Sequence, residues 1–312
     1  MHIDGIINVL KPKGISSFRA VNEIKKITGI KKAGHTGTLD PNASGILLIC
    51  LGYATKISRY IMDFKKCYTG EMILGIETDS QDSEGKITGK KKVDHKINGD
   101  RICTIFKKYI GTIQQTPPMF SAAYHQGKRL YKLARNGVQV ERIPKNITIF
   151  KLSLLQFIPL ENPIVRFEVE CSKGTYVRTL CAEIGKDLLC GAYMSELTRT
   201  KVGKYDISES MSIEDLRNDK NLLIKKIINI DEVLCHFGEI QIKRGIEEKV
   251  MHGGFVGELE MKQCVISKEA DYKHLVKVKD ETGKLLSIAE RVENEDHEII
   301  YKPIRVFCQS DH

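Results

Sequence analysis

The sequence predicts an α+β protein of two domains, and three observations support this. Strand-like and helix-like segments alternate along residues 1–237. Residues 46–51 are a continuous apolar run, and residues 165–171 alternate apolar with polar side chains, as strands do. From about residue 238 the segments become short and strand-like. We therefore expect a larger domain over residues 1–237 and a small, mostly-β domain over residues 238–312, a division that a chain of 312 residues can accommodate.

The first helix is predicted after Ser16, which can cap it. Apolar side chains then recur at helical spacing as far as Ile27, and Gly29 ends the pattern. The loop that follows, residues 34–45, fixes one carboxylate, Asp40, among small neighbours. Its glycines permit turns that other residues disfavour, and the apolar run after it anchors the loop to the core. The pattern is typical of a reactive site, although an ordinary Asp-Pro turn has the same local sequence.

A second strand is indicated by alternation from Tyr68 to Ile76. The polar segment after it, residues 78–85, lacks the acidic spacing of a calcium loop, and we expect a solvated turn there. A second amphipathic helix is predicted around residues 102–109. Residues 113–145 differ in kind, because basic and aromatic side chains interleave as they do in surfaces that stack bases and contact phosphates.

After the strand over residues 165–171, a helix is predicted with Thr175 as its N-cap. Arg178 then lies in the first turn, where the helix dipole disfavours a cation. An anion aimed at Arg178 would offset this placement, although an exposed arginine is also compatible with the sequence.

Composition and charge limit the function classes. No apolar stretch approaches the roughly 18 residues of a membrane span, and the N-terminus lacks a signal-peptide pattern, so we expect a cytoplasmic protein. The nine cysteines form no C-x-x-C pair and are expected to be reduced core residues. Residues 1–237 carry 37 Lys and Arg against 25 Asp and Glu, whereas residues 238–312 carry 12 against 15. A polyanionic partner is therefore expected on the larger domain.

Three segments resemble the TruB family of tRNA pseudouridine synthases. The resemblance is good over residues 5–205 and looser over the rest of the chain. The three segments are Gly34-His35-Thr36-Gly37-Thr38-Leu39-Asp40-Pro41, the 113–145 segment with Gly127-Lys128-Arg129-Leu130-Tyr131, and Lys173-Gly174-Thr175-Tyr176-Val177-Arg178-Thr179-Leu180. The resemblance implies a mixed, mostly antiparallel sheet flanked by helices, the pseudouridine synthase fold, with a PUA-like domain at the C-terminus. After Tyr193 the chain departs from the family pattern, since Thr198 stands where the family usually has the first of two arginines.

The resemblance also implies a reaction and its residues. Uridine at position 55 in the T loop of tRNA would be isomerised to pseudouridine, with Asp40 as the essential carboxylate, Arg178 keeping it ionised and Tyr68 stacking on the flipped base. Substrate or RNA contacts are implied for His35, Tyr176, Leu197, Lys11, Lys128 and Arg129, the last two in a tRNA-gripping insertion over residues 113–145. The sequence contains no Walker A, G-x-G-x-x-G or H-E-x-x-H pattern, so we expect no cofactor and no metal. We also expect a monomer that needs no membrane and no protein partner.

Three other readings stay open from the sequence. A non-catalytic RNA-binding or tRNA-folding protein could use the same scaffold, and an enzyme could also assist tRNA folding. An unrelated carboxylate hydrolase would need a second catalytic acid, which no motif supplies. A guide-RNA-dependent relative is disfavoured by the 113–145 insertion. The small C-terminal domain is expected to fold by itself and to touch only part of the RNA.

Overall fold

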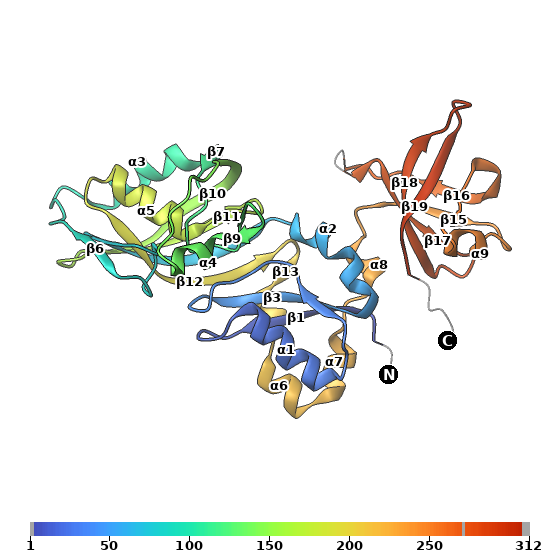
Figure 1. Ribbon diagram of the computed structural model, residues 1–312, viewed down its shortest axis with the longest axis horizontal. Helices are drawn as coiled ribbons and strands as arrows, with labels where there is room; N and C mark the ends of the chain where they lie inside the picture. The colour runs from blue at the N-terminus through green and yellow to red at the C-terminus, as the bar shows by residue number, and fades with distance from the viewer. Residues whose placement is uncertain (1–2, 270–271, 308–312) are drawn as a thin grey trace.

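The computed structural model describes residues 3–269 and 272–307, and two sheets dominate it. Figure 1 shows the larger sheet running through the body of the molecule and the smaller one at the opposite end from β6 (Ile87–Lys90) and α3 (Gly99–Tyr109). The short helices α2 (Ser58–Met62) and α8 (Ile230–Val233) lie between them. This arrangement confirms the expected α+β class and the separate small sheet.

The large sheet is mixed and mostly antiparallel. Its order is β14-β1-β3-β12-β4-β11-β10-β7, with β2 on β3 and β13 on β12. The pairs β1–β14 and β3–β12 are parallel, and the other strand pairs of this sheet are antiparallel. Its strands are β1 (Gly5–Lys11), β2 (Ala33–His35), β3 (Ser44–Leu51), β4 (Lys66–Leu74), β7 (Gly111–Gln115), β10 (Lys145–Ile158), β11 (Ile164–Cys171), β12 (Ala192–Val202), β13 (Tyr205–Asp206) and β14 (Met211–Ser212).

Helices cover this sheet, and the first of them matches the sequence pattern closely. Helix α1 (Ser17–Thr28) begins after Ser16, whose hydroxyl accepts from the Arg19 amide, and ends at Gly29, where φ is +74°. The further helices are α3 (Gly99–Tyr109), α4 (Leu130–Arg135), α5 (Val177–Asp187), α6 (Ile213–Asn218) and α7 (Lys220–Lys226). Two hairpins complete the domain, β5 (Ile76–Thr78) with β6 (Ile87–Lys90) and β8 (Tyr124–His125) with β9 (Lys128–Arg129).

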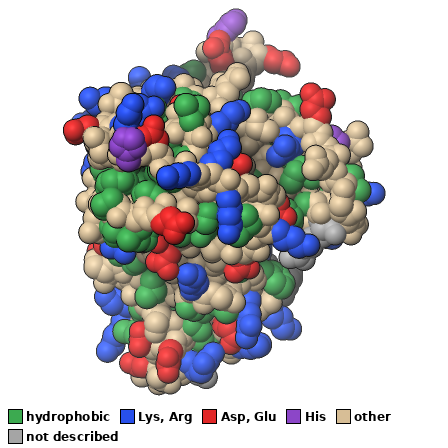
Figure 2. Space-filling model, turned by 90° about the vertical axis from the view of Figure 1, so that its left-hand side faces the viewer, with side chains coloured by type: hydrophobic (Ala, Val, Ile, Leu, Met, Phe, Trp, Pro, Cys, Tyr) green, Lys and Arg blue, Asp and Glu red, His purple; other side chains and the backbone are tan. Residues whose placement is uncertain are grey.

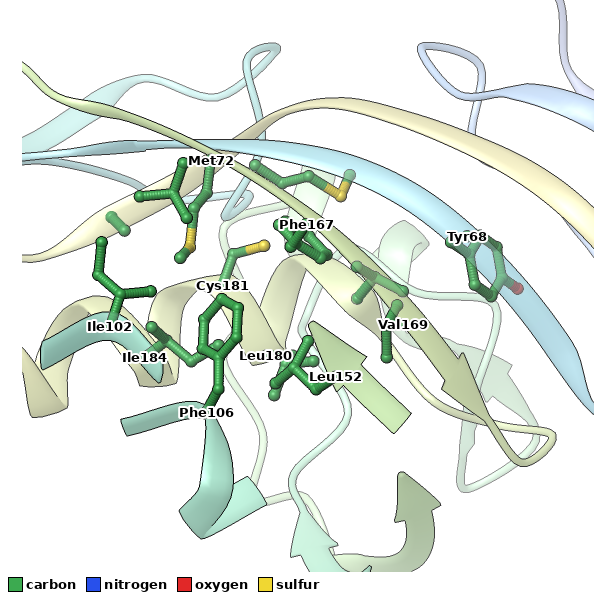
Figure 3. Close-up of a cluster of buried hydrophobic side chains, with 14 of the residues drawn as sticks. Tyr68, Met72, Ile102, Phe106, Leu152, Phe167, Val169, Leu180, Cys181 and Ile184 are labelled. Atoms are coloured by element: carbon green, nitrogen blue, oxygen red, sulfur yellow. The ribbon is translucent and has the colours of Figure 1, made fainter. Parts of the chain in front are cut away.

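The main core packs α3 and α5 against the sheet. Figure 3 shows Phe106 of α3 and Leu180 of α5 facing Phe167 and Val169 of β11. Tyr68 of β4 lies at one end of this cluster with its hydroxyl directed away from the other labelled side chains. Apolar burial on this scale is the dominant stabilising term, so the core holds β4, β11 and α5 in fixed relation.

The small sheet follows the order β16-β15-β17-β18-β19. Its elements are β15 (Gly238–Ile242), α9 (Glu247–Met251), β16 (Met261–Val265), β17 (Leu275–Lys279), β18 (Leu285–Glu293) and β19 (Ile299–Val306). Leu275 and Ile288 of this sheet belong to one buried cluster with Tyr60, Val202 and Leu234 of the larger domain. The two sheets therefore share a hydrophobic core at their junction.

Two expectations about local structure are wrong. Residues 78–85 are not a simple solvated turn, because Asp82 is 3% exposed and Ser80 is 7% exposed. Helix α5 is capped at Tyr176 rather than at Thr175, whose hydroxyl donates to the Ser172 carbonyl. No side chain caps the first turn of α5, and the Tyr176 amide donates to the side chain of Gln115 on β7, a tertiary contact just before the helix.

Charge, cysteines and membrane-spanning potential add three facts. Figure 2 shows Lys and Arg side chains over much of the face at the β6 and α3 end, with Asp and Glu between them. The described cysteines are free thiols. Cys50, Cys171, Cys181 and Cys190 are buried as expected, whereas Cys103, Cys235 and Cys264 are exposed and are not core residues. Within residues 3–269 and 272–307, no helix combines the length and apolar character needed to span a bilayer.

Candidate active site

The loop between β2 and β3 holds Asp40 through contacts on both sides. Just before it, the Ser17 hydroxyl donates to the Leu39 carbonyl at 2.9 Å and accepts from the Leu39 amide at 2.8 Å. After it, Gly45 has φ of +108°, and a Cβ there would lie 2.2 Å from the Arg199 carbonyl oxygen. The loop is thus anchored to α1 and pressed against β12, which fixes the carboxylate in place.

Lys11 supports the same loop from behind. Its side chain is fully buried, and its ammonium donates to the carbonyls of Ile15 at 2.7 Å, Pro12 at 2.9 Å and Pro41 at 3.5 Å. Burial lowers the pKa of Lys11 to about 8, although Asp40 opposes this. Lys11 was expected among the substrate or RNA contacts, in a segment whose role is mainly to shape the site, and its burial beneath the Asp40 loop suits that shaping role.

Arg178 bridges two carboxylates. Its Nη1 lies 3.3 Å from Asp40 Oδ2 and 2.9 Å from Asp82 Oδ2. Asp82 is held in turn by the Ser80 hydroxyl at 2.5 Å and the Glu84 amide at 3.1 Å. The unfavourable position of a cation in the first turn of α5 is therefore offset by two anions, as the sequence suggested for one.

The electrostatics of Asp40 follow from these neighbours. Burial raises the pKa of Asp40 above its ordinary value, Arg178 opposes that rise and Asp82 adds to it. The Asp40 side chain is still 34% exposed, whereas Asp82 is 5% exposed. Asp40 is thus the carboxylate that a ligand can reach, and Asp82 is the one that positions Arg178.

Asp40 opens into a pocket of about 540 Å³. Tyr68, Tyr176, Arg178 and Leu197 line this pocket together with Asp40, so five of the predicted site residues come together. Of the described residues that line it, Asp40 is the one acidic side chain. Burial raises the pKa of Tyr68, which keeps its phenol neutral at physiological pH. The pocket therefore combines one reachable carboxylate with an aromatic ring and an apolar wall.

Three other predicted residues lie outside this lining. His35 ends β2, its Nδ1 accepts from the Gly37 amide at 3.4 Å, and burial lowers its pKa. Lys128 and Arg129 lie on β9 of the insertion, where the Arg129 guanidinium stacks 4.7 Å from the Tyr124 ring centroid and donates to the Ala122 carbonyl. The structure places these residues around the site rather than in it.

The insertion nevertheless touches the site directly. Arg178 Nη2 donates to the carbonyl of Phe120 at 2.5 Å, and Ser121 and Ala122 line the pocket. At the far end of the insertion, Arg142 Nη1 donates to the carbonyl of Pro117 at 3.1 Å. The segment that carries Lys128 and Arg129 is thus tied to the ion pair of the site.

Sequence reasoning missed three residues here. Asp82 lies in a polar loop with no periodicity, and its ion pair is with a residue 96 positions later in the chain. Lys66 and Arg199 both line the pocket, at 6% and 2% exposure, on strands that we examined for apolar side chains and not for buried charge. Thr198, the departure from the family pattern, bonds the Ser44 hydroxyl at 2.9 Å and so joins β12 to β3.

Family models match most of the large domain. Residues 25–177 match the TruB family pseudouridylate synthase N-terminal domain, and residues 178–234 match the tRNA pseudouridylate synthase B C-terminal domain. Among curated relatives, tRNA pseudouridine synthase B of Clostridium acetobutylicum is 45% identical, covering 80% of this chain and 84% of the relative. The enzyme of the same name from Clostridium perfringens is 39% identical, covering 93% and 96%.

Solved structures agree on the fold. A chain in the crystal structure of a Cbf5-Nop10-Gar1 complex has a TM-score of 0.74 at 26% identity, covering 100% of this chain and 87% of that one. A chain in the structure of an H/ACA RNP bound to a substrate RNA containing 2′-deoxyuridine has a TM-score of 0.71 at 23% identity, covering 98% and 86%. The likeness extends over both sheets of the present chain.

Proposed function

Because the chain belongs to the TruB family of pseudouridylate synthases, we propose that it isomerises uridine to pseudouridine at position 55 in the T loop of tRNA, with Asp40 as the essential carboxylate. The observation that carries the assignment to Asp40 is the pocket itself. Asp40 is its one acidic lining residue among those described, and Arg178 contacts it at 3.3 Å.

The reaction needs little more than this geometry. The N1–C1′ bond must break, the base must turn, and C5 must bond to C1′. A single ionised carboxylate can attack C1′ or remove a proton from C2′. Since burial raises the pKa of Asp40, the adjacent Arg178 is what keeps a working fraction ionised near neutral pH. No redox step or group donor enters, so the reaction calls for no cofactor and no metal.

The rest of the pocket suits a flipped uridine. Extracting the base from the T loop costs a few kcal/mol, which stacking recovers in part. Tyr68 offers a ring for the base, and Tyr176 and Leu197 offer a wall that excludes water. We propose that His35, which lies outside the pocket lining, contacts the RNA at the position that the flipped base has left and helps to reorganise it.

The RNA around the base is expected on the larger domain. Its 37 basic against 25 acidic side chains supply the phosphate contacts, and the insertion with Lys128 and Arg129 grips the T stem-loop. The insertion makes a guide RNA or a protein partner unnecessary. We expect a monomer that works in the cytoplasm.

Replacing Asp40 tests the function. The variant Asp40→Asn keeps the shape of the side chain and removes its charge, so turnover should vanish. Binding of an unmodified tRNA should stay within about tenfold, which is roughly 1.4 kcal/mol. Pseudouridine would be mapped by a chemical adduct at position 55. Product formation by a verified Asp40→Asn preparation, or none by the wild type, would refute the proposal.

A further inference from the structure

The basic side chains that line the pocket outnumber the carboxylates that pair with them. Five basic residues line it. Arg178 pairs with Asp40 and Asp82, and Lys173 pairs with Asp63. Lys145 lies at the exposed start of β10. Lys66 and Arg199 are buried, and within the described part of the chain neither has a carboxylate at ion-pair distance.

The contacts of these two cations are all to neutral groups. The Lys66 ammonium donates to the Met62 carbonyl. Arg199 Nε donates to the Ile46 carbonyl at 2.8 Å, and its Nη2 donates to the Gly37 carbonyl at 3.1 Å. Burial, with Arg199 nearby, lowers the pKa of Lys66 to about 8, so the ammonium persists at neutral pH. Two adjacent buried cations without an anion are costly to maintain, and an anionic ligand would relieve that cost.

Both cations flank Tyr68. Lys66 and Tyr68 are two residues apart on β4 and so share a face of the strand. Arg199 pairs with Tyr68 across the β4–β12 ladder. Asp40 and Arg178 line the same pocket from the β2–β3 loop and from α5. A base stacked on Tyr68 would therefore have Asp40 beside its sugar and the unpaired cations beside its ring.

We propose that Lys66 and Arg199 stabilise the negative charge that the uracil ring acquires when its glycosidic bond breaks, an inference that rests on the proposed function. The N1–C1′ bond breaks with its electron pair remaining on N1. If Asp40 attacks C1′, an ester forms and the base leaves as an anion. If Asp40 takes the C2′ proton, a C1′–C2′ double bond forms and the base again leaves as an anion.

In both routes one negative charge passes from Asp40 to the base. Reattachment returns this charge to Asp40. As C5 bonds to C1′, either the ester bond between Asp40 and C1′ breaks with its electron pair on the carboxylate, or the C1′–C2′ double bond takes its proton back from Asp40 at C2′. Transfer of a proton from C5 to N1 then completes pseudouridine with no further change in charge. A cation fixed beside the ring is more strongly attracted to the departing base than to neutral uridine, which is the condition for lowering the barrier.

The test uses a T stem-loop RNA with uridine or 5-fluorouridine at the target position. Fluorine withdraws electrons, so fluorouracil is a more stable anion and needs less help to leave. Single-turnover loss of the target nucleoside at saturating enzyme would be followed by nucleoside mass analysis. For uridine, Lys66→Met should lower the rate constant by about a hundredfold to a thousandfold, in line with the loss of one preorganised donor.

The fall in rate constant caused by Lys66→Met should be clearly smaller with 5-fluorouridine than with uridine. Lys66→Arg, which keeps the positive charge, should retain most of the wild-type rate. Lys66→Gln keeps a donor for the Met62 carbonyl without the charge, and should behave like Lys66→Met if folding is intact by thermal melting. The matched control is Lys201→Met. Lys201 lies opposite Cys67 on the same ladder, is 52% exposed and pairs with Asp206. Lys201→Met should therefore leave the ratio of the rate constants on the uridine and 5-fluorouridine RNAs as in the wild type.

Three results would overturn the inference while leaving the role of Asp40 intact. An unchanged rate in Lys66→Met and Lys66→Gln would make the lysine structural. Equal losses of rate on the uridine and 5-fluorouridine RNAs would show that Lys66 does not stabilise the departing base. Weaker RNA binding with an unchanged saturated rate, and a salt slope reduced by about one, would assign Lys66 to a backbone phosphate.

Discussion

Arg178 and Asp82 form an ion pair in which both partners are buried, with Nη1 and Oδ2 2.9 Å apart and side-chain exposures of 6% and 5%. The contact of Arg178 with Asp40 is longer, at 3.3 Å, and more open. Asp82 thus anchors the guanidinium, and Asp40 is left available to a substrate. The anchor also has an electrostatic cost, because the Asp82 charge raises the pKa of Asp40.

Removing that charge should have two opposite effects. In Asp82→Asn the pKa of Asp40 should fall, so the acidic limb of the pH–rate profile should move to lower pH. The plateau rate should drop, by up to about a hundredfold, because a loosened Arg178 positions Asp40 less precisely. Single-turnover rates between pH 5 and 8 would show both effects, and a limb that moves upward would contradict the assigned geometry.

Arg178→Met should move the same limb the other way. Without the guanidinium, burial and Asp82 would raise the pKa of Asp40 unopposed, so less carboxylate is ionised at neutral pH. Arg178→Lys should rescue little, because lysine lacks the planar fork that reaches both carboxylates and the Phe120 carbonyl. The same pH series measures this, and a profile unchanged in Arg178→Met would refute the pairing.

Stability should respond to Asp40 in the opposite sense from activity. The folded-state pKa of Asp40 is raised above its unfolded value, so its ionised form destabilises the fold once the pH rises above the unfolded value near 4. Asp40→Asn should therefore melt at or above the wild-type temperature at pH 7.5. The difference should shrink as the pH falls toward about 4. A lower melting temperature for Asp40→Asn at pH 7.5 would show that Arg178 needs both carboxylates for folding.

Local patterns predicted much of this molecule for identifiable physical reasons. Ser16 and Gly29 bound α1 because a cap and a left-handed glycine act within one turn. The run 46–51 is buried because β3 lies between β1 and β12. The Asp40 loop, Tyr68 and Arg178 were found through a long family motif rather than through periodicity.

The features that could not be predicted from the sequence depend on contacts between segments far apart in the chain. Asp82 is buried through contacts with the distant residues Arg178 and Met194, and the Tyr176 amide at the N-cap of α5 is held by Gln115 of β7. Lys11 was singled out through family resemblance, and the three carbonyls that enclose it come from separate segments of the chain. A hydropathy pattern carries no information about such partners.

RNA affinity should depend steeply on salt, with the insertion contributing measurably. Lys128 is exposed, whereas Arg129 stacks on Tyr124 and bonds the Ala122 carbonyl. Neutralising both should lower the magnitude of the log–log salt slope by roughly one to two, and Lys128→Ala alone by about one. Titrating the T stem-loop RNA between low and moderate salt measures the slope. A slope equal to wild type in the double variant would remove both residues from the phosphate contacts.

The junction of the two sheets gives the last prediction. Ile288 of β18 is fully buried in the cluster that also contains Tyr60 and Val202, so the small domain does not simply rest on the large one. Its attachment is reinforced by Asp231 of α8, which accepts from Lys277 at 2.8 Å and from Lys279 at 2.9 Å. A chain ending at Phe237 would lose this cover and expose apolar surface of the large domain.

Ile288→Ala should therefore lower the free energy of unfolding of the whole chain by about 2 to 5 kcal/mol, the usual range for a large-to-small change in a core. Because the core is shared, the variant should melt in one transition, and its saturated turnover should match wild type where it is folded. Calorimetry with kinetics at saturating tRNA measures both. Two separated transitions, with only the smaller one shifted, would show that the small sheet folds by itself. In that case the chain ending at Phe237 should retain its turnover number and lose only apparent affinity for tRNA, as expected when contacts common to the ground state and the transition state are removed.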